Sequence, residues 1–218
     1  MNRHSTQEQP TVFIVDDDPS VLRSLTRMFQ LEGYAVEGFA HPRQMLERGP
    51  GKRPGCVVMD LRMPELNGLE LQAQLRQVGW MQPIIFISGH GDVPAVVKAM
   101  KAGAVDFLSK PFSTAELQAA VERALAQDRV ASSAEQELAA LRARFSKLTP
   151  REQQVCRMVA QGMLNKQIAA ELGTAEQTVR LQRSRVMDKL EVDSVAELVR
   201  LLERLEPSQP TSGKSPGL

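Results

Sequence analysis

Short apolar runs alternate with amphipathic stretches between Thr11 and Asp128. Four of these runs have the length and composition of buried strands, and a less regular fifth run covers Tyr34 to Gly38. Most of the stretches between them carry apolar residues at helical spacing. Because strands that alternate with helices indicate βαβ units, we expect a doubly wound, five-stranded parallel sheet between two helical layers. The clear runs are Val12–Val15, Cys56–Met59, Ile84–Ile87 and Val105–Leu108.

From Leu148 onward the apolar spacing is helical and no strand pattern appears. Residues 129–147, rich in Ala, Leu, Glu and Arg, predict a helical linker before this region. The sequence Thr149-Pro150-Arg151-Glu152 combines a capping box with proline at the first helical position. We expect four helices, near 150–161, 165–172, 175–190 and 194–205.

The chain is therefore expected to contain two domains between two disordered ends. An α/β domain spans residues 11–128, and a small all-α domain of four helices spans residues 148–206. The polar residues 1–10 and the Pro-, Ser- and Gly-rich residues 207–218 are expected to be disordered.

Composition excludes several classes of function. No apolar run approaches the roughly 18 residues of a membrane helix, and the polar N-terminus does not resemble a signal peptide; we expect a cytoplasmic protein without a membrane partner. Cys56 and Cys156 lack a Cys-x-x-Cys spacing, which excludes a disulfide framework and a thiolate zinc site. The 27 basic and 26 acidic side chains leave a net charge of +1, so a nucleic-acid partner must be inferred from local pattern.

Acidic side chains stand where two predicted strands end. Asp16-Asp17-Asp18 follows the first strand and Asp60 ends the third. The carboxyl ends of parallel strands meet in one crevice, where clustered carboxylates repel one another unless a cation lies among them. Mg²⁺ suits such oxygen ligands. With Ser88 at the end of the fourth strand and Lys110 after the fifth, the pattern indicates a phosphoryl acceptor with Asp60 as nucleophile.

Each part of this pattern also has a simpler interpretation. Asp16–Asp18 alone is compatible with a solvated turn or a helix cap before Pro19, and Lys110 with a surface charge. The spacing of Asp16 and Asp18 also fits an Mg²⁺-dependent phosphatase with an aspartyl nucleophile, which would make the protein an enzyme. Such a phosphatase does not require Asp60, Ser88 and Lys110 at later strand ends, so the combination favours the acceptor.

Four motifs carry a resemblance over residues 11–128: Val15-Asp16-Asp17-Asp18, Met59-Asp60-Leu61-Arg62-Met63-Pro64, Ile87-Ser88-Gly89-His90-Gly91-Asp92 and Ser109-Lys110-Pro111-Phe112. In order and spacing they resemble the receiver domain of two-component systems. The resemblance implies a sheet order of 2-1-3-4-5 and phosphorylation of Asp60 by a cognate sensor histidine kinase. It implies that Mg²⁺ (or Mn²⁺) is bound directly by Asp17, Asp60 and the backbone carbonyl of Arg62, with Asp16 acting through water.

The same resemblance implies a conformational switch. Lys110 and Ser88 would bind the phosphoryl group, and Phe107 would move when Ser88 moves. Phe107 carries no hydroxyl that could hold it in an outward position, and an aromatic residue in a strand is also compatible with a core position.

A helix-turn-helix pattern occupies residues 165–190, with its turn at Gly173. The apolar positions Ile168, Ala169, Leu172, Val179 and Val186 face a shared core. The second helix has a charge of +3 over residues 177–190, so it could enter a major groove and meet phosphates and base edges. A solvated helix face, or a module that binds protein, is the alternative. The basic residues are Arg180, Arg183, Arg185 and Lys189.

The segment from Leu148 to Val199 resembles a LuxR-type DNA-binding domain, and a receiver followed by such a domain is typical of the NarL/FixJ response regulators, here nearest to the FixJ branch. The resemblance implies a regulator that catalyses only its own phosphoryl transfer, dimerises on phosphorylation, binds promoter DNA and activates transcription with RNA polymerase.

The resemblance to the LuxR-type domain also implies individual DNA contacts. By position, Arg180, Leu181 and Ser184 would face base edges. Gln182 stands where the family often has histidine, and Leu164 where a small polar residue is common. The candidates for phosphate contacts are Lys166, Thr178, Arg183 and Arg185.

The homodimer is expected to form on the surface made by the fourth helix, the fifth strand and the last helix of the receiver. A two-fold axis there would deliver two helix-turn-helix units to half-sites about one or more helical turns apart. The residues expected on this surface are Val93, Val96, Lys98, Lys101 and Glu116.

Overall fold

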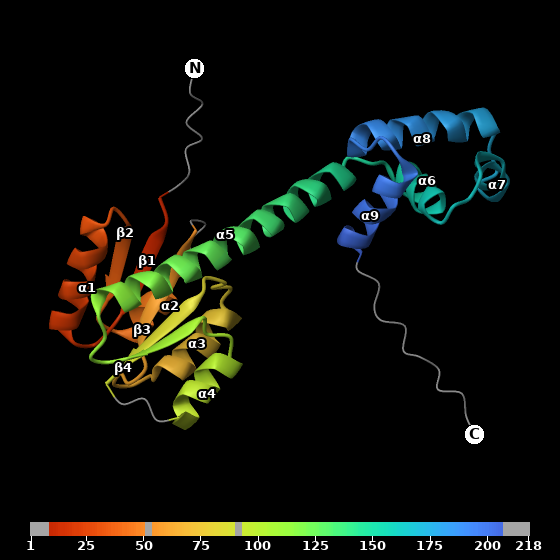
Figure 1. Cartoon of the computed structure of the whole chain (residues 1–218). Helices are drawn as coiled ribbons and strands as arrows, with labels where there is room; N and C mark the ends of the chain where they lie inside the picture. Colours follow the sequence, from red (N-terminus) through yellow and green to blue (C-terminus); the bar gives the residue numbers. More distant parts are fainter. Residues whose placement is uncertain (1–8, 51–53, 90–92, 207–218) are drawn as a thin grey trace, which may run out of the picture. The chain divides into compact units, whose positions relative to one another are not determined.

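A five-stranded parallel sheet forms the centre of the N-terminal unit (Figure 1). The computed structural model describes residues 9–50, 54–89 and 93–206. The strands pair in the order β2-β1-β3-β4-β5, with every pair parallel, which confirms the predicted sheet. The strands are β1 (Thr11–Val15), β2 (Ala35–Phe39), β3 (Gly55–Asp60), β4 (Ile84–Ser88) and β5 (Asp106–Ser109).

Three predictions fall on parts of the chain outside the described residues. These parts are residues 1–8, residues 207–218, and His90, Gly91 and Asp92 of the third receiver motif. The expectation of disordered ends therefore stays a prediction.

Two helical layers cover the sheet (Figure 1), and the burial of alternate side chains along β1 shows which helices form each layer. Val12 and Ile14 are buried in the cluster that contains α1 and α5, whereas Phe13 and Val15 are buried in the cluster that contains α2, α3 and α4. Successive apolar residues of β1 thus join two different cores. The helices are α1 (Pro19–Leu31), α2 (Pro42–Arg48), α3 (Gly68–Gln77), α4 (Val93–Lys101) and α5 (Thr114–Phe145).

Helix α2 has no counterpart among the predicted elements. It has seven residues, of which only Pro42 and Met45 are buried, so it offers too few apolar positions to reveal a helical period. Strands β2 and β5 each begin and end one residue later than the apolar runs that predicted them.

The chain divides into two compact units, residues 1–132 and 133–218, and the boundary lies inside α5. Residues 129–145 of the expected linker continue this helix. Although α5 has 32 residues, neither it nor any other helix in the described part of the chain is long and apolar enough to cross a membrane.

Four helices form the described part of the C-terminal unit after α5, as predicted. Their core contains Ile168, Ala169, Val179 and Val186, all buried, and Leu172, partly buried. The predicted shared core of the helix-turn-helix is therefore present. The helices are α6 (Pro150–Ala160), α7 (Asn165–Glu171), α8 (Glu176–Leu190) and α9 (Val195–Leu205).

The predicted capping box at Thr149 has a second role in holding α8. The Thr149 backbone N–H donates to the carboxylate of buried Glu152 at 2.8 Å, and Lys189 Nζ of α8 donates to the same carboxylate at 2.6 Å. The hydrogen bonds from Lys189 and Thr149 hold the pKa of Glu152 below its ordinary value. The end of α8 is thus tied to the beginning of α6.

Candidate functional site

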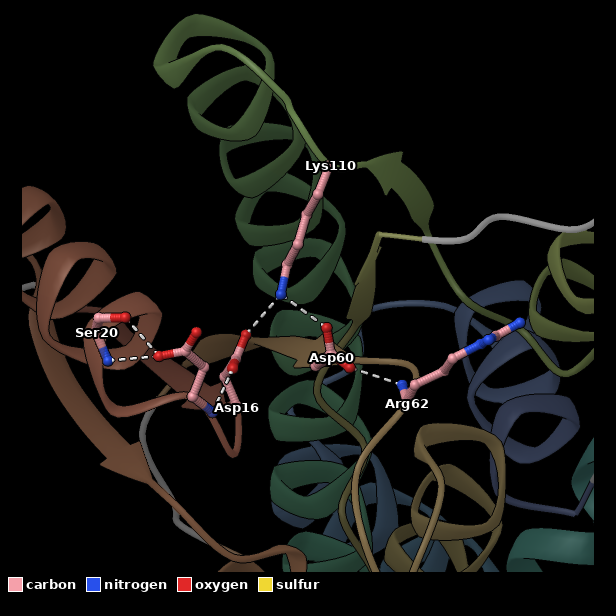
Figure 2. A network of polar contacts seen from close by, with 6 residues as sticks. Asp16, Ser20, Asp60, Arg62 and Lys110 are labelled. Atoms are coloured by element: carbon pink, nitrogen blue, oxygen red, sulfur yellow. Dashed lines mark hydrogen bonds and ion pairs between the residues drawn. The ribbon is translucent and has the colours of Figure 1, made fainter.

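Three strand ends bring Asp16, Asp60 and Lys110 together at one edge of the sheet (Figure 2). Asp16 follows β1, Asp60 ends β3, and Lys110 follows β5. Lys110 Nζ lies 2.9 Å from Asp16 Oδ2 and 2.8 Å from Asp60 Oδ1, so one ammonium group bridges the two carboxylates. The convergence that the sheet order requires is therefore observed for these three residues.

Burial makes this bridge a strong electrostatic feature. The relative exposed fraction is 1% for Asp16 and 6% for Asp60, and the Lys110 side chain is partly buried. Burial alone would lower the pKa of Lys110, but the hydrogen bonds and charges of Asp60 and Asp16 outweigh it and raise this pKa above its ordinary value. Lys110 therefore stays positively charged at neutral pH.

Backbone N–H groups also donate hydrogen bonds to the carboxylates of Asp60 and Asp16. Asp60 Oδ2 accepts from the Arg62 N–H at 2.6 Å, and Asp16 Oδ1 accepts from the Asp18 N–H at 2.9 Å (Figure 2). The Arg62 side chain is exposed, and Asp17 is exposed beside the bridge.

Asp18 acts as a helix cap. It is the N-cap of α1, and its carboxylate accepts hydrogen bonds from the hydroxyl and the backbone N–H of Ser20, the latter at 2.8 Å. These bonds lower the pKa of Asp18. The capping interpretation is therefore correct for Asp18, while Asp16 beside it belongs to the bridge.

The remaining receiver candidates lie on β4 and β5. Ser88 ends β4 and is buried, and its backbone carbonyl accepts from the Lys110 N–H at 2.7 Å. Phe107 of β5 is half-buried and packs against the core that contains α3 and α4. This packing agrees with the core interpretation of Phe107, and its role as a switch stays a prediction.

The chemistry of these side chains suits a hard cation. Asp16, Asp17 and Asp60 offer only oxygen donors, and three carboxylates outnumber the single ammonium group of Lys110, which leaves a negative charge to be neutralised. In the arrangement of the described residues, no group of three or more His, Cys, Asp or Glu side chains is close enough together to hold a metal ion.

Gly68 is a positioning residue that the sequence pattern did not single out. It begins α3, and a Cβ atom there would lie 2.7 Å from the Asp60 backbone oxygen and 2.8 Å from the Phe86 ring. Only glycine lets α3 approach the Asp60 strand so closely. The signal that could have found it is the sequence Asn67-Gly68, in which Asn67 caps the helix.

A second candidate surface lies on α7 and α8. Val179, Val186 and Leu190 of α8 are buried, and most of the predicted DNA-contacting residues point away from them. Arg183 is half-buried, and its Nη1 donates to Asn165 Oδ1 of α7 at 3.2 Å. The exposed candidates are Lys166, Thr178, Arg180, Leu181, Ser184 and Arg185.

Two side chains of α8 have roles that charge counting did not reveal. Lys189, counted among the basic residues of the helix, is paired with Glu152 and is not free to contact a phosphate. Gln182 buries its side-chain Oε1 without a hydrogen-bond partner. The free basic surface of α8 is therefore limited to arginines.

Comparison with known proteins identifies both units. Residues 12–122 match the family described as "Response regulator receiver domain", and residues 146–202 match "Bacterial regulatory proteins, luxR family". Nodulation protein W of Bradyrhizobium diazoefficiens is 48% identical over 89% of this chain and 86% of its own length. The chain belongs to the NarL/FixJ family of response regulators.

Other members of the NarL/FixJ family agree in sequence and in structure. Transcriptional regulatory protein FixJ of Bradyrhizobium diazoefficiens is 40% identical over 88% of this chain and 94% of its own length. The structure of the response regulator StyR covers 90% of this chain and 99% of its own, at a TM-score of 0.81 and 45% identity. This NarL/FixJ response regulator is therefore a transcription factor with a receiver domain and a LuxR-type DNA-binding domain, as the sequence predicted.

Proposed function

We propose that a sensor histidine kinase phosphorylates this response regulator on Asp60, and that the phosphorylated form dimerises and binds promoter DNA to activate transcription by RNA polymerase. The observation that carries the proposal is the Lys110 bridge between buried Asp16 and Asp60. A partly buried cation at the carboxyl ends of the strands would neutralise charge on an incoming phosphoryl group. Lys110 and Ser88 would bind that group, and Phe107 would respond to the movement of Ser88.

A divalent cation completes this chemistry. Asp17, Asp60 and the backbone carbonyl of Arg62 would hold Mg²⁺ or Mn²⁺ directly, with Asp16 acting through water. When bound, the cation neutralises charge that develops on the phosphoryl oxygens. Asp60 supplies the attacking oxygen, and the Arg62 N–H holds the other oxygen of the same carboxylate in place.

The alternative of a phosphatase is not favoured by Asp18. An acid that protonates a leaving group works best with a raised pKa. The hydrogen bonds from Ser20 instead lower the pKa of Asp18 and hold its carboxylate at the N-terminus of α1. We therefore propose that the only phosphoryl transfer that the protein catalyses is its own.

The dimer is proposed to use the surface of α4, β5 and α5. Val93, Lys98, Lys101 and Glu116 are exposed, whereas Val96 is half-buried. The structure adds two further exposed apolar side chains on α4, Val97 and Met100. An apolar stripe bordered by lysines would suit a self-complementary contact across a two-fold axis.

Charge reversal on this surface tests dimerisation. Lys101→Glu should leave phosphorylation of Asp60 by acetyl phosphate unchanged while weakening phosphorylation-dependent self-association about tenfold or more, because a two-fold axis doubles the effect of each reversed charge. Sedimentation velocity with and without the phosphoryl donor measures this change. Arg27→Glu on α1, a helix that is not part of the proposed surface, is the matched control and should dimerise normally. Equal self-association of both variants would show that the dimer interface lies on another surface of the protein.

The division of the predicted DNA contacts into base contacts and phosphate contacts gives a second test. Arg180→Ala should relax sequence preference at one position of the operator, at a cost of about 1–3 kcal/mol for the preferred base pair. Lys166→Ala should weaken all sequences alike and reduce the slope of log affinity against log salt by about one unit. Fluorescence anisotropy on operator variants over a salt series distinguishes the two, and identical behaviour of both variants would contradict the assignment.

A further inference from the structure

Leu181 is an exposed leucine in the middle of a basic helix. Its relative exposed fraction is 52%. The buried side of α8 is formed by Val179, Val186 and Leu190. At about 100° per residue, Leu181 lies roughly 140–180° around the helix from these three residues. The core of the C-terminal unit therefore makes no use of its side chain.

The neighbours of Leu181 are polar or basic. Gln177 and Ser184 lie within about 60° of it on one side of the helix, and Thr178 and Arg185 within about 60° on the other. All four are exposed. A single apolar side chain within a hydrophilic, positively charged surface does not form a docking patch for an apolar protein face, but the charge suits a nucleic-acid duplex.

Leucine can read only one chemical feature of a major groove. Its side chain has neither donor nor acceptor, so it cannot bond to the polar edges of the bases. The apolar group in the groove is the C5-methyl of thymine. Gln182, the adjacent side chain with an amide suited to adenine, buries its Oε1 and cannot present that oxygen to a base.

We infer that Leu181 contacts the thymine methyl group of one T·A pair in each half-site, and that this contact fixes part of the operator sequence. The inference rests on the proposed binding of DNA through α8. It assigns to Arg180 and Ser184 the polar readout of neighbouring pairs, and to Leu181 a preference that no hydrogen bond carries.

Replacing thymine by deoxyuridine tests the inference, because it removes the methyl and leaves every hydrogen-bonding group in place. An operator is first selected from a pool of random duplexes by the full chain treated with acetyl phosphate and Mg²⁺. Each thymine is then replaced singly. At one position per half-site, the replacement should weaken binding about fourfold, the effect of about 0.8 kcal/mol for one buried methyl group, while other positions change little.

Variants then assign the effect to its side chain. Leu181→Ala should bind the thymine operator several-fold more weakly and should no longer distinguish thymine from deoxyuridine at that position. Leu164→Ala, which truncates a 68% exposed leucine at the N-cap of α7, is the matched control and should keep the full distinction. Leu181→Gln keeps an exposed side chain of similar length and should select a base other than thymine at the same position.

Two results would overturn the inference while leaving the proposed function intact. The wild-type protein could select an operator in which no thymine is sensitive to loss of its methyl group. The sensitivity could also persist unchanged in Leu181→Ala, either with no loss of affinity or with thymine and deoxyuridine operators weakened equally. Failure of the wild-type protein to select any sequence would instead contradict the proposed DNA binding, and the inference with it.

Discussion

Asp60→Asn should abolish phosphorylation of the protein by acetyl phosphate and Mg²⁺. The wild-type chain should gain one acid-labile phosphoryl group, and the variant none, because an amide oxygen is a poor nucleophile and the side chain no longer carries the negative charge that attracts Mg²⁺. The hydrogen bond from the Arg62 N–H can still form to the amide oxygen, so the local backbone should be retained. Intact-protein mass spectrometry at neutral pH measures the stoichiometry.

A matched substitution distinguishes loss of the phosphoryl acceptor from loss of a nearby negative charge. Asp18→Asn removes a carboxylate two residues from Asp16, but asparagine is an equally good N-cap, so this variant should be phosphorylated as the wild type is. Chelation of Mg²⁺ should abolish labelling in both the wild type and Asp18→Asn. Labelling of Asp60→Asn at the wild-type level would show that the acceptor is another residue.

Lys110→Ala should still accept a phosphoryl group in the presence of Mg²⁺, more slowly, but should lose most phosphorylation-dependent DNA binding. The variant removes two charge-assisted hydrogen bonds, to Asp16 at 2.9 Å and to Asp60 at 2.8 Å. Each such bond contributes about 1.5–3 kcal/mol. In the phosphorylated form the same ammonium group would bond to a phosphoryl oxygen, and the loss of one such bond should reduce the gain in operator affinity on phosphorylation about tenfold or more. Anisotropy measurements with and without acetyl phosphate give this gain directly.

The pH dependence of the same variant has a definite sign. Because the pKa of Lys110 is raised in the folded protein, its contribution to the free energy of unfolding is complete at neutral pH and is lost only as pH rises through the raised value. The stability difference between wild type and Lys110→Ala should thus be constant from neutral to weakly alkaline solution and should shrink only as pH rises through the raised pKa of Lys110.

Arg27→Ala, which removes an exposed cation from α1, is the control for the DNA-binding measurement and should retain the phosphorylation response. A full response in Lys110→Ala would contradict the assigned role.

The sequence predicts that Asp16, Asp60 and Lys110 converge, because the elements that position them have strong local signals. The strands before Asp16 and Asp60 are wholly buried and therefore appear as unbroken apolar runs. Once these strands are parallel, their carboxyl ends must share an edge, so Lys110 after β5 reaches both acids across the sheet. Helix α2 lacks such a signal, since two buried residues in seven define no period.

Pairing between side chains of different helices is what the sequence does not reveal. Lys189 and Glu152 are 37 residues apart, and nothing in their spacing distinguishes a buried ion pair from two solvated charges. Asp18, the helix cap, and Asp16, the partner of Lys110, likewise lie two residues apart in one acidic run, and only the path of the chain into α1 separates their roles. The burial of the Gln182 amide oxygen depends on packing in the same way.

Different residues of α8 hold the helix in the domain and face outward from it, and this separation affects how such regulators can diverge. The residues that fix the helix (Val179, Val186 and Leu190 in the core, and Lys189 on Glu152) are distinct from the outward-facing ones. Substitutions at exposed positions such as Leu181 or Ser184 should therefore alter which promoters a duplicated copy controls at little cost in stability, since surface changes usually shift it by about 0.5 kcal/mol or less. A copy of the gene can thus acquire a new set of target genes in single steps, each through a protein that still folds.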